Sequence, residues 1–197
     1  MDGFAARLLH AKSPIGADLD SLSDVVSFGV APGFIMFWLM NRYLDSRLWL
    51  VPPISIGGIY MLPCIAFILP VFSAIRLAKF NNDDTQTTLF RGLPAPGMAL
   101  FIASLPLALS QTGHLTDGAL SYWACLGITL VFAFMMVSRL RFFSFKMKSA
   151  KWKGNEVRWI FLAVAIVGFA IFRFVALPFI MMLYILMSIV FAEKTEC

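Results

Sequence analysis

The sequence has few charged residues, few cysteines and only two histidines. Charged residues make up 14% of the 197-residue chain, whereas about a quarter of a typical soluble domain is charged. Cys64, Cys125 and Cys197 are far apart and have no metal-binding or redox spacing. The basic residues lie in short loops, so the net charge of +5 does not indicate nucleic-acid binding.

Hydrophobic residues are abundant, at 60% of the chain with a mean hydropathy of +0.83. A transmembrane helix needs about 20 consecutive, mostly apolar residues. Six stretches qualify, approximately 25–44, 51–75, 95–112, 119–138, 158–173 and 175–192. We therefore expect an all-α fold, a polytopic transmembrane helix bundle of about six spans that forms one integral-membrane domain over residues 1–197.

Two features modify this expected bundle. The fifth and sixth stretches are separated only around Arg173, so they form either a tight hairpin or fewer than two elements. Pro63 and Pro70 fall inside the second stretch, where proline is expected to kink a helix.

The loop charges predict the orientation. If the six spans alternate, the side that holds residues 1–24 carries thirteen Lys and Arg, and the opposite side carries three. The thirteen are Arg7, Lys12, Arg76, Lys79, Arg91, Arg139, Arg141, Lys146, Lys148, Lys151, Lys153, Arg158 and Lys194, and the three are Arg42, Arg47 and Arg173. The positive-inside rule then places residues 1–24 in the cytoplasm. The most basic loop, 139–158, either maintains this orientation or also contacts anionic lipid headgroups.

Three carboxylates, Asp2, Asp20 and Asp24, come directly before the first apolar stretch. Asp20 and Asp24 are four residues apart, so they share a face if a helix begins near Asp20. Clustered carboxylates provide the hard oxygen ligands that Mg²⁺ and Mn²⁺ prefer. Residues 1–24 are therefore a candidate catalytic segment, although each acid alone would more commonly be a helix cap or a solvated side chain.

Other residues of this segment suit a phosphorylated ligand. Arg7 supplies a permanent positive charge with a forked geometry that matches phosphate. Gly3 permits a close approach of the backbone, and Gly16 suits either a tight turn or the passage of a ligand past the backbone.

The same residues resemble the signature of the CDP-alcohol phosphotransferase family, D-x-x-D-G-x-x-A-R, eight residues, then G-x-x-x-D-x-x-x-D. The match covers residues 2–24. Residues 19–32, 76–81 and 92–96 resemble the bacterial phosphatidylserine synthase branch of this family.

The resemblance implies that a phosphatidyl group is transferred from CDP-diacylglycerol to L-serine, giving phosphatidylserine and CMP, at the cytoplasmic face of a bacterial inner membrane. It implies two Mg²⁺ or Mn²⁺ ions held by Asp2, Asp20 and Asp24, with Asp24 also the catalytic base. Gly3, Ala6, Arg7 and Gly16 would bind the CDP and its phosphates. Arg76, Asn81 and Arg91 are candidate contacts to serine or phosphate. The protein is expected in the lipid bilayer, where a homodimer is one option.

One part of the signature is missing, because its first Asp would fall two positions before Met1. Family members have apolar helices before the motif, so we expect this chain to be N-terminally truncated and to bind metal poorly by itself. The alternatives are transfer to glycerol phosphate, inositol or choline, an inactive remnant, and a transporter or channel. The last is disfavoured because Asp2, Asp20 and Asp24 all precede the first span.

Overall fold

A computed structural model describes residues 14–44, 55–56, 59–81, 89–113, 122–138, 141–143 and 156–191. These residues are almost entirely helical, with four strands of two or three residues each. The structure confirms a helical fold. In the described part of the chain, three helical stretches are long and apolar enough to cross a membrane, whereas hydropathy predicts six.

The first helical stretch is continuous from Pro14 to Tyr43. It comprises α2 (Pro14–Val25), a π-helical turn η1 (Val26–Val30) and α3 (Ala31–Tyr43). It begins several residues before Asp20, the expected start. Proline is favourable in the first position of a helix, since it has no N–H to leave unpaired. The prediction missed this start because hydropathy does not detect the polar turns that follow Pro14.

The second stretch differs most from expectation. The sequence predicts that the second span begins at position 51. This region instead contains two short strands, β1 (Ser55–Ile56) and β2 (Ile59–Tyr60), which pair antiparallel. The helix begins with the 3₁₀ segment η2 (Leu62–Phe67) and continues as α4 (Ile68–Asn81). The predicted start was therefore wrong. Pro63 lies in η2 and Pro70 in the first turn of α4, so the expected irregularity occurs at the change from 3₁₀ to α-helix.

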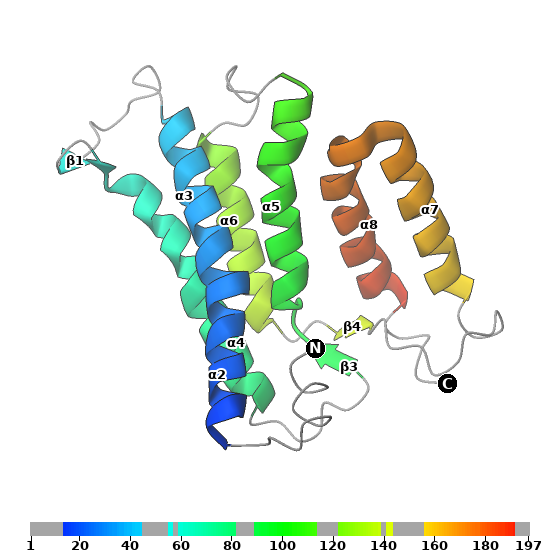
Figure 1. The fold of residues 1–197 in the computed structure, drawn as a ribbon, viewed down its shortest axis with the longest axis horizontal. Helices are drawn as coiled ribbons and strands as arrows, with labels where there is room; N and C mark the ends of the chain where they lie inside the picture. Colours follow the sequence, from blue (N-terminus) through cyan, green and yellow to red (C-terminus); the bar gives the residue numbers. More distant parts are fainter. Residues whose placement is uncertain are drawn as a thin grey trace.

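The remaining helices match their predicted ranges closely. They are α5 (Ala95–Gln111), α6 (Tyr122–Val137), α7 (Glu156–Phe172) and α8 (Ala176–Phe191). A turn, η3 (Arg173–Val175), joins α7 to α8, and Arg173 has φ of 51° there. Figure 1 shows α7 and α8 side by side, so the hairpin interpretation is confirmed.

Successive helices alternate in direction, which gathers distant segments at one end of the bundle (Figure 1). We call this the motif end. It holds the start of α2, the last turns of α4, the starts of α5 and α7, and the ends of α6 and α8. The opposite end holds Tyr43, β1 and η3.

Two strands join the loops at the motif end. β3 (Leu89–Arg91) pairs antiparallel with β4 (Arg141–Phe143), with Arg91 opposite Arg141. Gly92 follows β3 with φ of 79°, and a Cβ there would collide with the Met136 carbonyl oxygen. Only glycine fits this position, and Pro94 then precedes α5 as its N-cap. Residues 92–96 therefore shape the entry to the third apolar stretch.

The core lies between the helices, and the outer faces are also apolar. Met36, Leu39, Leu69, Met98 and Ile102 are completely buried. Large apolar side chains are exposed on the outward faces of every long helix, which suits a hydrocarbon solvent rather than water.

Three described helical stretches are long and apolar enough to cross a membrane: Asp18–Tyr43, Leu62–Asn81 and Trp159–Ser188. The third is folded back at η3 into two arms. Ala95–Gln111 and Tyr122–Val137 are apolar but shorter. The chain is thus a helical membrane protein.

Candidate active site

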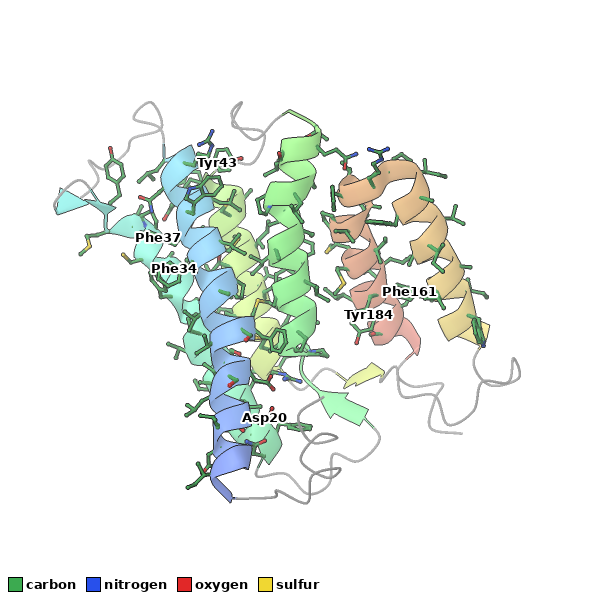
Figure 2. All side chains as sticks on the ribbon, in the orientation of Figure 1. Asp20, Phe34, Phe37, Tyr43, Phe161 and Tyr184 are labelled. Carbon is green, nitrogen blue, oxygen red and sulfur yellow. The ribbon has the colours of Figure 1, made fainter. Side chains whose placement is uncertain are left out.

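Two of the three predicted metal ligands lie on one helix. Asp20 and Asp24 are both in α2, one turn apart, so they point to the same side as predicted. Asp18 and Asp20 are exposed, and Asp24 is half-buried. Figure 2 shows Asp20 at the motif end, below the level at which α5 begins.

The last turn of α4 is held against this acidic helix. Asn81 donates a hydrogen bond from Nδ2 to Ser21 Oγ at 3.2 Å. Further along, a Cβ built on Gly29 would lie 3.0 Å from the Ser73 Cβ, so the backbones of η1 and α4 are very close. Asn81, a predicted substrate contact, therefore lies beside the acids and touches the helix that carries them.

These two contacts fix how the antiparallel helices align. Ser21 faces Asn81 and Gly29 faces Ser73, and the same alignment places Arg76 level with Val26. Val26 is two residues beyond Asp24, a separation of roughly 3 Å along a helix axis. Arg76 and Ser73 are three residues apart and lie on neighbouring positions of the same face. Arg76 therefore lies close to Asp24 along the helix pair.

Arg76 is partly buried, and its Nε is fully buried with no hydrogen-bond partner in the described part of the chain. A buried donor without a protein partner is unfavourable, so such a group commonly binds a ligand or ordered water.

The other predicted site residues have different positions. Gly16 lies in the first turns of α2 and is exposed, so the tight-turn interpretation was wrong and only the ligand-passage interpretation stays a prediction. Arg91 ends β3 at the motif end. The N-terminal members of the motif lie outside the described residues: Asp2, Gly3, Ala6 and Arg7. Of the basic loop 139–158, only β4 and the first residues of α7 are described.

The fit to a metal can be tested in part. Within the described ranges, no group of three or more His, Cys, Asp or Glu could hold a metal ion. The two carboxylates on α2 supply hard oxygen ligands, and a further ligand must come from elsewhere. Asp2 is the candidate from the sequence.

Tyr184 and Ser188 were missed by the sequence prediction. They are 5% and 0% exposed, and they lie one turn apart on the same face of α8. A signal was available, because these two polar residues are four apart in a stretch that is otherwise apolar. Polar groups repeated on one face of a membrane helix indicate a face that turns toward protein or ligand.

Comparison with known proteins decides the family. The profile of the family described as CDP-alcohol phosphatidyltransferase matches residues 1–135. The chain belongs to this family. The match includes the motif segment and all helices up to most of α6, and it ends before α7 and α8.

Several curated relatives have the same name, CDP-diacylglycerol–serine O-phosphatidyltransferase. The relative from Helicobacter pylori (strain J99) is 32% identical over 154 residues, covering 77% of this chain and 57% of its own length. The relative from Bacillus subtilis is 32% identical over 157 residues, covering 76% of this chain and 71% of its own. The relative from Methanocaldococcus jannaschii is 37% identical over 102 residues, covering 52% and 41%. The chain thus spans little more than half the length of the Helicobacter relative.

Proposed function

We propose that the protein transfers a phosphatidyl group from CDP-diacylglycerol to L-serine, giving phosphatidylserine and CMP. The family match and the names of the relatives support this activity. The observation that carries it is the juxtaposition of Asp20 and Asp24 on α2 with the last turns of α4, through the hydrogen bond from Asn81 to Ser21.

In the proposed reaction, the hydroxyl oxygen of serine attacks the phosphorus that carries the diacylglycerol. The bond from this phosphorus to the bridging oxygen breaks, and CMP leaves with that oxygen. Asp24 accepts the hydroxyl proton of serine, and its half-buried position next to Asp20 suits this role. Arg76, level with Val26 at the start of η1, would supply positive charge near the reacting groups.

Asp20, Asp24 and Asp2 would hold two Mg²⁺ or Mn²⁺ ions. When bound, such ions neutralise the diphosphate and stabilise the leaving CMP. Gly3, Ala6, Arg7 and Gly16 would contact the CDP, and Arg91 is a further candidate for a phosphate or serine contact. Chelation with EDTA should abolish CMP release, and addition of either ion should restore it.

The site would face the cytoplasm from a bacterial inner membrane. Of the cations on described residues, five are at the motif end and two at the other: Arg76, Lys79, Arg91, Arg141 and Arg158 against Arg42 and Arg173. This imbalance supports a cytoplasmic motif end. The alternating directions of the helices suit six spans. The lengths of α5 to α8 also suit spans, because each helix has 16 or 17 residues. Such a helix is about 25 Å long, which is near the lower limit for crossing a membrane.

The deciding experiment supplies purified protein in lipid vesicles with CDP-diacylglycerol and a panel of acceptors. The acceptors are L-serine, glycerol 3-phosphate, myo-inositol and choline, and the lipid products are identified by mass spectrometry. We expect phosphatidylserine with release of an equal amount of CMP. A different product lipid would retain the family reaction but reject serine as acceptor. The same assay is run on a chain extended at its N-terminus to restore the first Asp of the signature, and absence of product from every alcohol in both forms would contradict the proposed activity.

A further inference from the structure

Two separate contacts hold the acidic helix α2 and the turn η1 against α4. In α2, Ser21 Oγ accepts a hydrogen bond of 3.2 Å from Asn81 Nδ2. In η1, a Cβ at Gly29 would lie 3.0 Å from the Ser73 Cβ. Ser21 and Gly29 are eight residues apart, so the two contacts are about 12 Å apart along the helix axis. Two contacts at this separation fix the tilt of α2 against α4, whereas a single contact permits α2 to tilt.

Helix α2 receives little support from the rest of the described structure. Among the described elements, it packs mainly against η1 and α4. Leu19 and Leu22 are 61% and 63% exposed, so no described element covers the face of α2 on which they lie. The position of α2 relative to the bundle therefore depends largely on its contacts with α4.

The π-helical turn η1 provides a point about which α2 can tilt. The Ala31 N–H donates to the Val26 carbonyl oxygen, five residues back instead of the four of an α-helix. Pro32 follows, and it has no N–H to donate to the Phe28 carbonyl oxygen. Sharp bends in helices occur at such π-turns and at prolines. Because Gly29 lies in this turn, its close contact with α4 marks the pivot.

A small tilt about η1 would displace both acids. Asp20 is nine residues from Gly29, about 13 Å along the helix, so a tilt of about 2° moves Asp20 by about 0.5 Å. Mg²⁺ requires near-ideal octahedral geometry, and catalytic groups must be held within about 0.5 Å of their productive positions. Ser21 follows Asp20 directly and is a helix-face neighbour of Asp24, three residues further on. The hydrogen bond to Ser21 therefore restrains α2 at the level of the carboxylates.

We propose that Asn81 is a positioning residue that fixes the carboxylates of Asp20 and Asp24 through its hydrogen bond to Ser21. This inference rests on the proposed function, and it gives Asn81 a role different from the substrate contact that the sequence suggests. A positioning residue acts only through Ser21, whereas a substrate contact acts without it. Removal of either end of the hydrogen bond must then have the same effect on the reaction.

The test is a double-mutant cycle of Asn81→Ala and Ser21→Ala in vesicles, in whichever form of the chain, unmodified or N-terminally extended, releases CMP. Loss of the hydrogen bond should lower kcat and raise the Mg²⁺ or Mn²⁺ concentration for half-maximal rate, each about two- to tenfold. The double variant should be no worse than either single one, because both substitutions remove the same bond. The KM for L-serine and the unfolding midpoint should change little. Effects that multiply in the double variant, or a raised KM for serine in Asn81→Ala alone, would overturn the inference.

Matched controls have the same side chains with partners in their own helix. Ser23 of α2 donates its hydroxyl to the Leu19 carbonyl oxygen, and Asn41 of α3 donates from Nδ2 to the Phe37 carbonyl oxygen. Ser23→Ala and Asn41→Ala should therefore leave kcat and the metal dependence unchanged. Ser21→Thr keeps the acceptor hydroxyl and should also retain both. Equal losses in the controls and in the cycle, or in Ser21→Thr and Ser21→Ala, would reject the inference.

Hydrogen exchange in the detergent-solubilised chain gives a readout independent of turnover. The α2 amides should exchange faster in Asn81→Ala and in Ser21→Ala than in the unmodified chain, because a released helix opens more readily. If exchange responds in this way but no form of the chain makes a lipid product, the proposed function fails and the restraint of α2 by Asn81 stands. If phosphatidylserine forms with unchanged kcat and metal dependence in both variants, the function stands and the inference fails. Equal exchange in the variants and the unmodified chain would overturn the inference directly.

Discussion

At the residue scale, Asp20 and Asp24 share a helix face but differ in exposure, so their substitutions should have different effects. Asp24→Asn should lower the rate of CMP release by about 10²-fold or more, because the serine hydroxyl loses its base. Binding of CDP-diacylglycerol should be largely retained. Asp20→Asn should instead raise the Mg²⁺ or Mn²⁺ concentration needed for half-maximal rate. Initial rates over a metal titration measure both effects.

The control for these acids is Asp18→Asn. Asp18 is exposed and is not on the face shared by Asp20 and Asp24, so its substitution should leave the rate and the metal dependence unchanged. Wild-type turnover in Asp24→Asn would defeat the assignment of the base. An equal loss in all three variants would indicate that net charge matters and not the position of the carboxylates.

Gly29 determines how closely α4 approaches the acidic helix. A Cβ at this position would lie 3.0 Å from the Ser73 Cβ and 3.1 Å from the Pro70 Cα, and the backbone atom cannot move without shifting α4. We expect Gly29→Ala to lower the free energy of unfolding by about 1–3 kcal/mol, as overpacking usually does. The unfolding midpoint in detergent measures the change.

Gly127 provides the comparison for Gly29. It is an exposed glycine of α6 with no atom within 4 Å of a Cβ built there. Gly127→Ala should be neutral or stabilising by up to about 1 kcal/mol, because alanine favours a helix over glycine. If both variants lowered stability equally, close packing at Gly29 would not be the cause.

At the element scale, Gln111 attaches the α7–α8 hairpin to the end of α5. Its Nε2 donates to the Phe172 carbonyl oxygen at 3.1 Å, and its Oε1 accepts from the Phe174 N–H at 2.8 Å. Gln111→Ala should lower the free energy of unfolding by about 1–3 kcal/mol, because both hydrogen bonds are lost. Hydrogen exchange should become faster at the Phe174 amide. The neighbouring exposed Ser110 is the control, and exchange in Ser110→Ala should be unchanged. Equal protection in both variants would show that the hairpin is held by other contacts.

Hydropathy predicts the helices where the apolar pattern is uninterrupted. The ranges of α5 to α8 agree with the predicted stretches within about three residues. The start of the second stretch was wrong because apolar residues favour strands as well as helices, and β1 and β2 lie in such a run. The early start at Pro14 was missed because the first turns of α2 are polar on one side, which a span criterion does not detect.

The site was predicted in a different way from the fold. The spacing of Asp20 and Asp24 was sufficient to place them on one face, since that relation is local to a single helix. The hydrogen bond between Asn81 and Ser21 joins residues 60 positions apart. Contacts of this kind depend on how the helices pack, so residue spacing does not predict them. Polar residues repeated on one helix face, such as Tyr184 and Ser188, indicate only that the face turns toward protein or ligand.

At the scale of the whole molecule, the alternating helices give the bundle two chemically different ends. The motif end carries the acids and most of the described cations. The other end carries Arg42, which lies 5.4 Å from the Trp38 ring centroid, and Arg173 in η3. If the motif end is cytoplasmic, substrates reach the acids from the side on which serine and CMP are soluble, while the acyl chains of the donor remain in the bilayer.

Cysteine labelling tests this orientation in intact bacterial cells. In a variant with Cys64, Cys125 and Cys197 replaced by serine or alanine, we introduce Ser110→Cys at one end or Lys79→Cys at the other, both at exposed positions. A membrane-impermeant maleimide should label the Ser110→Cys protein in intact cells and the Lys79→Cys protein only after lysis. The reverse pattern would place the acids outside the cytoplasm, and labelling of both in intact cells would contradict alternation of the spans. Because neither substitution changes Asp20 or Asp24, CMP release by both variants confirms that the labelled molecules are folded.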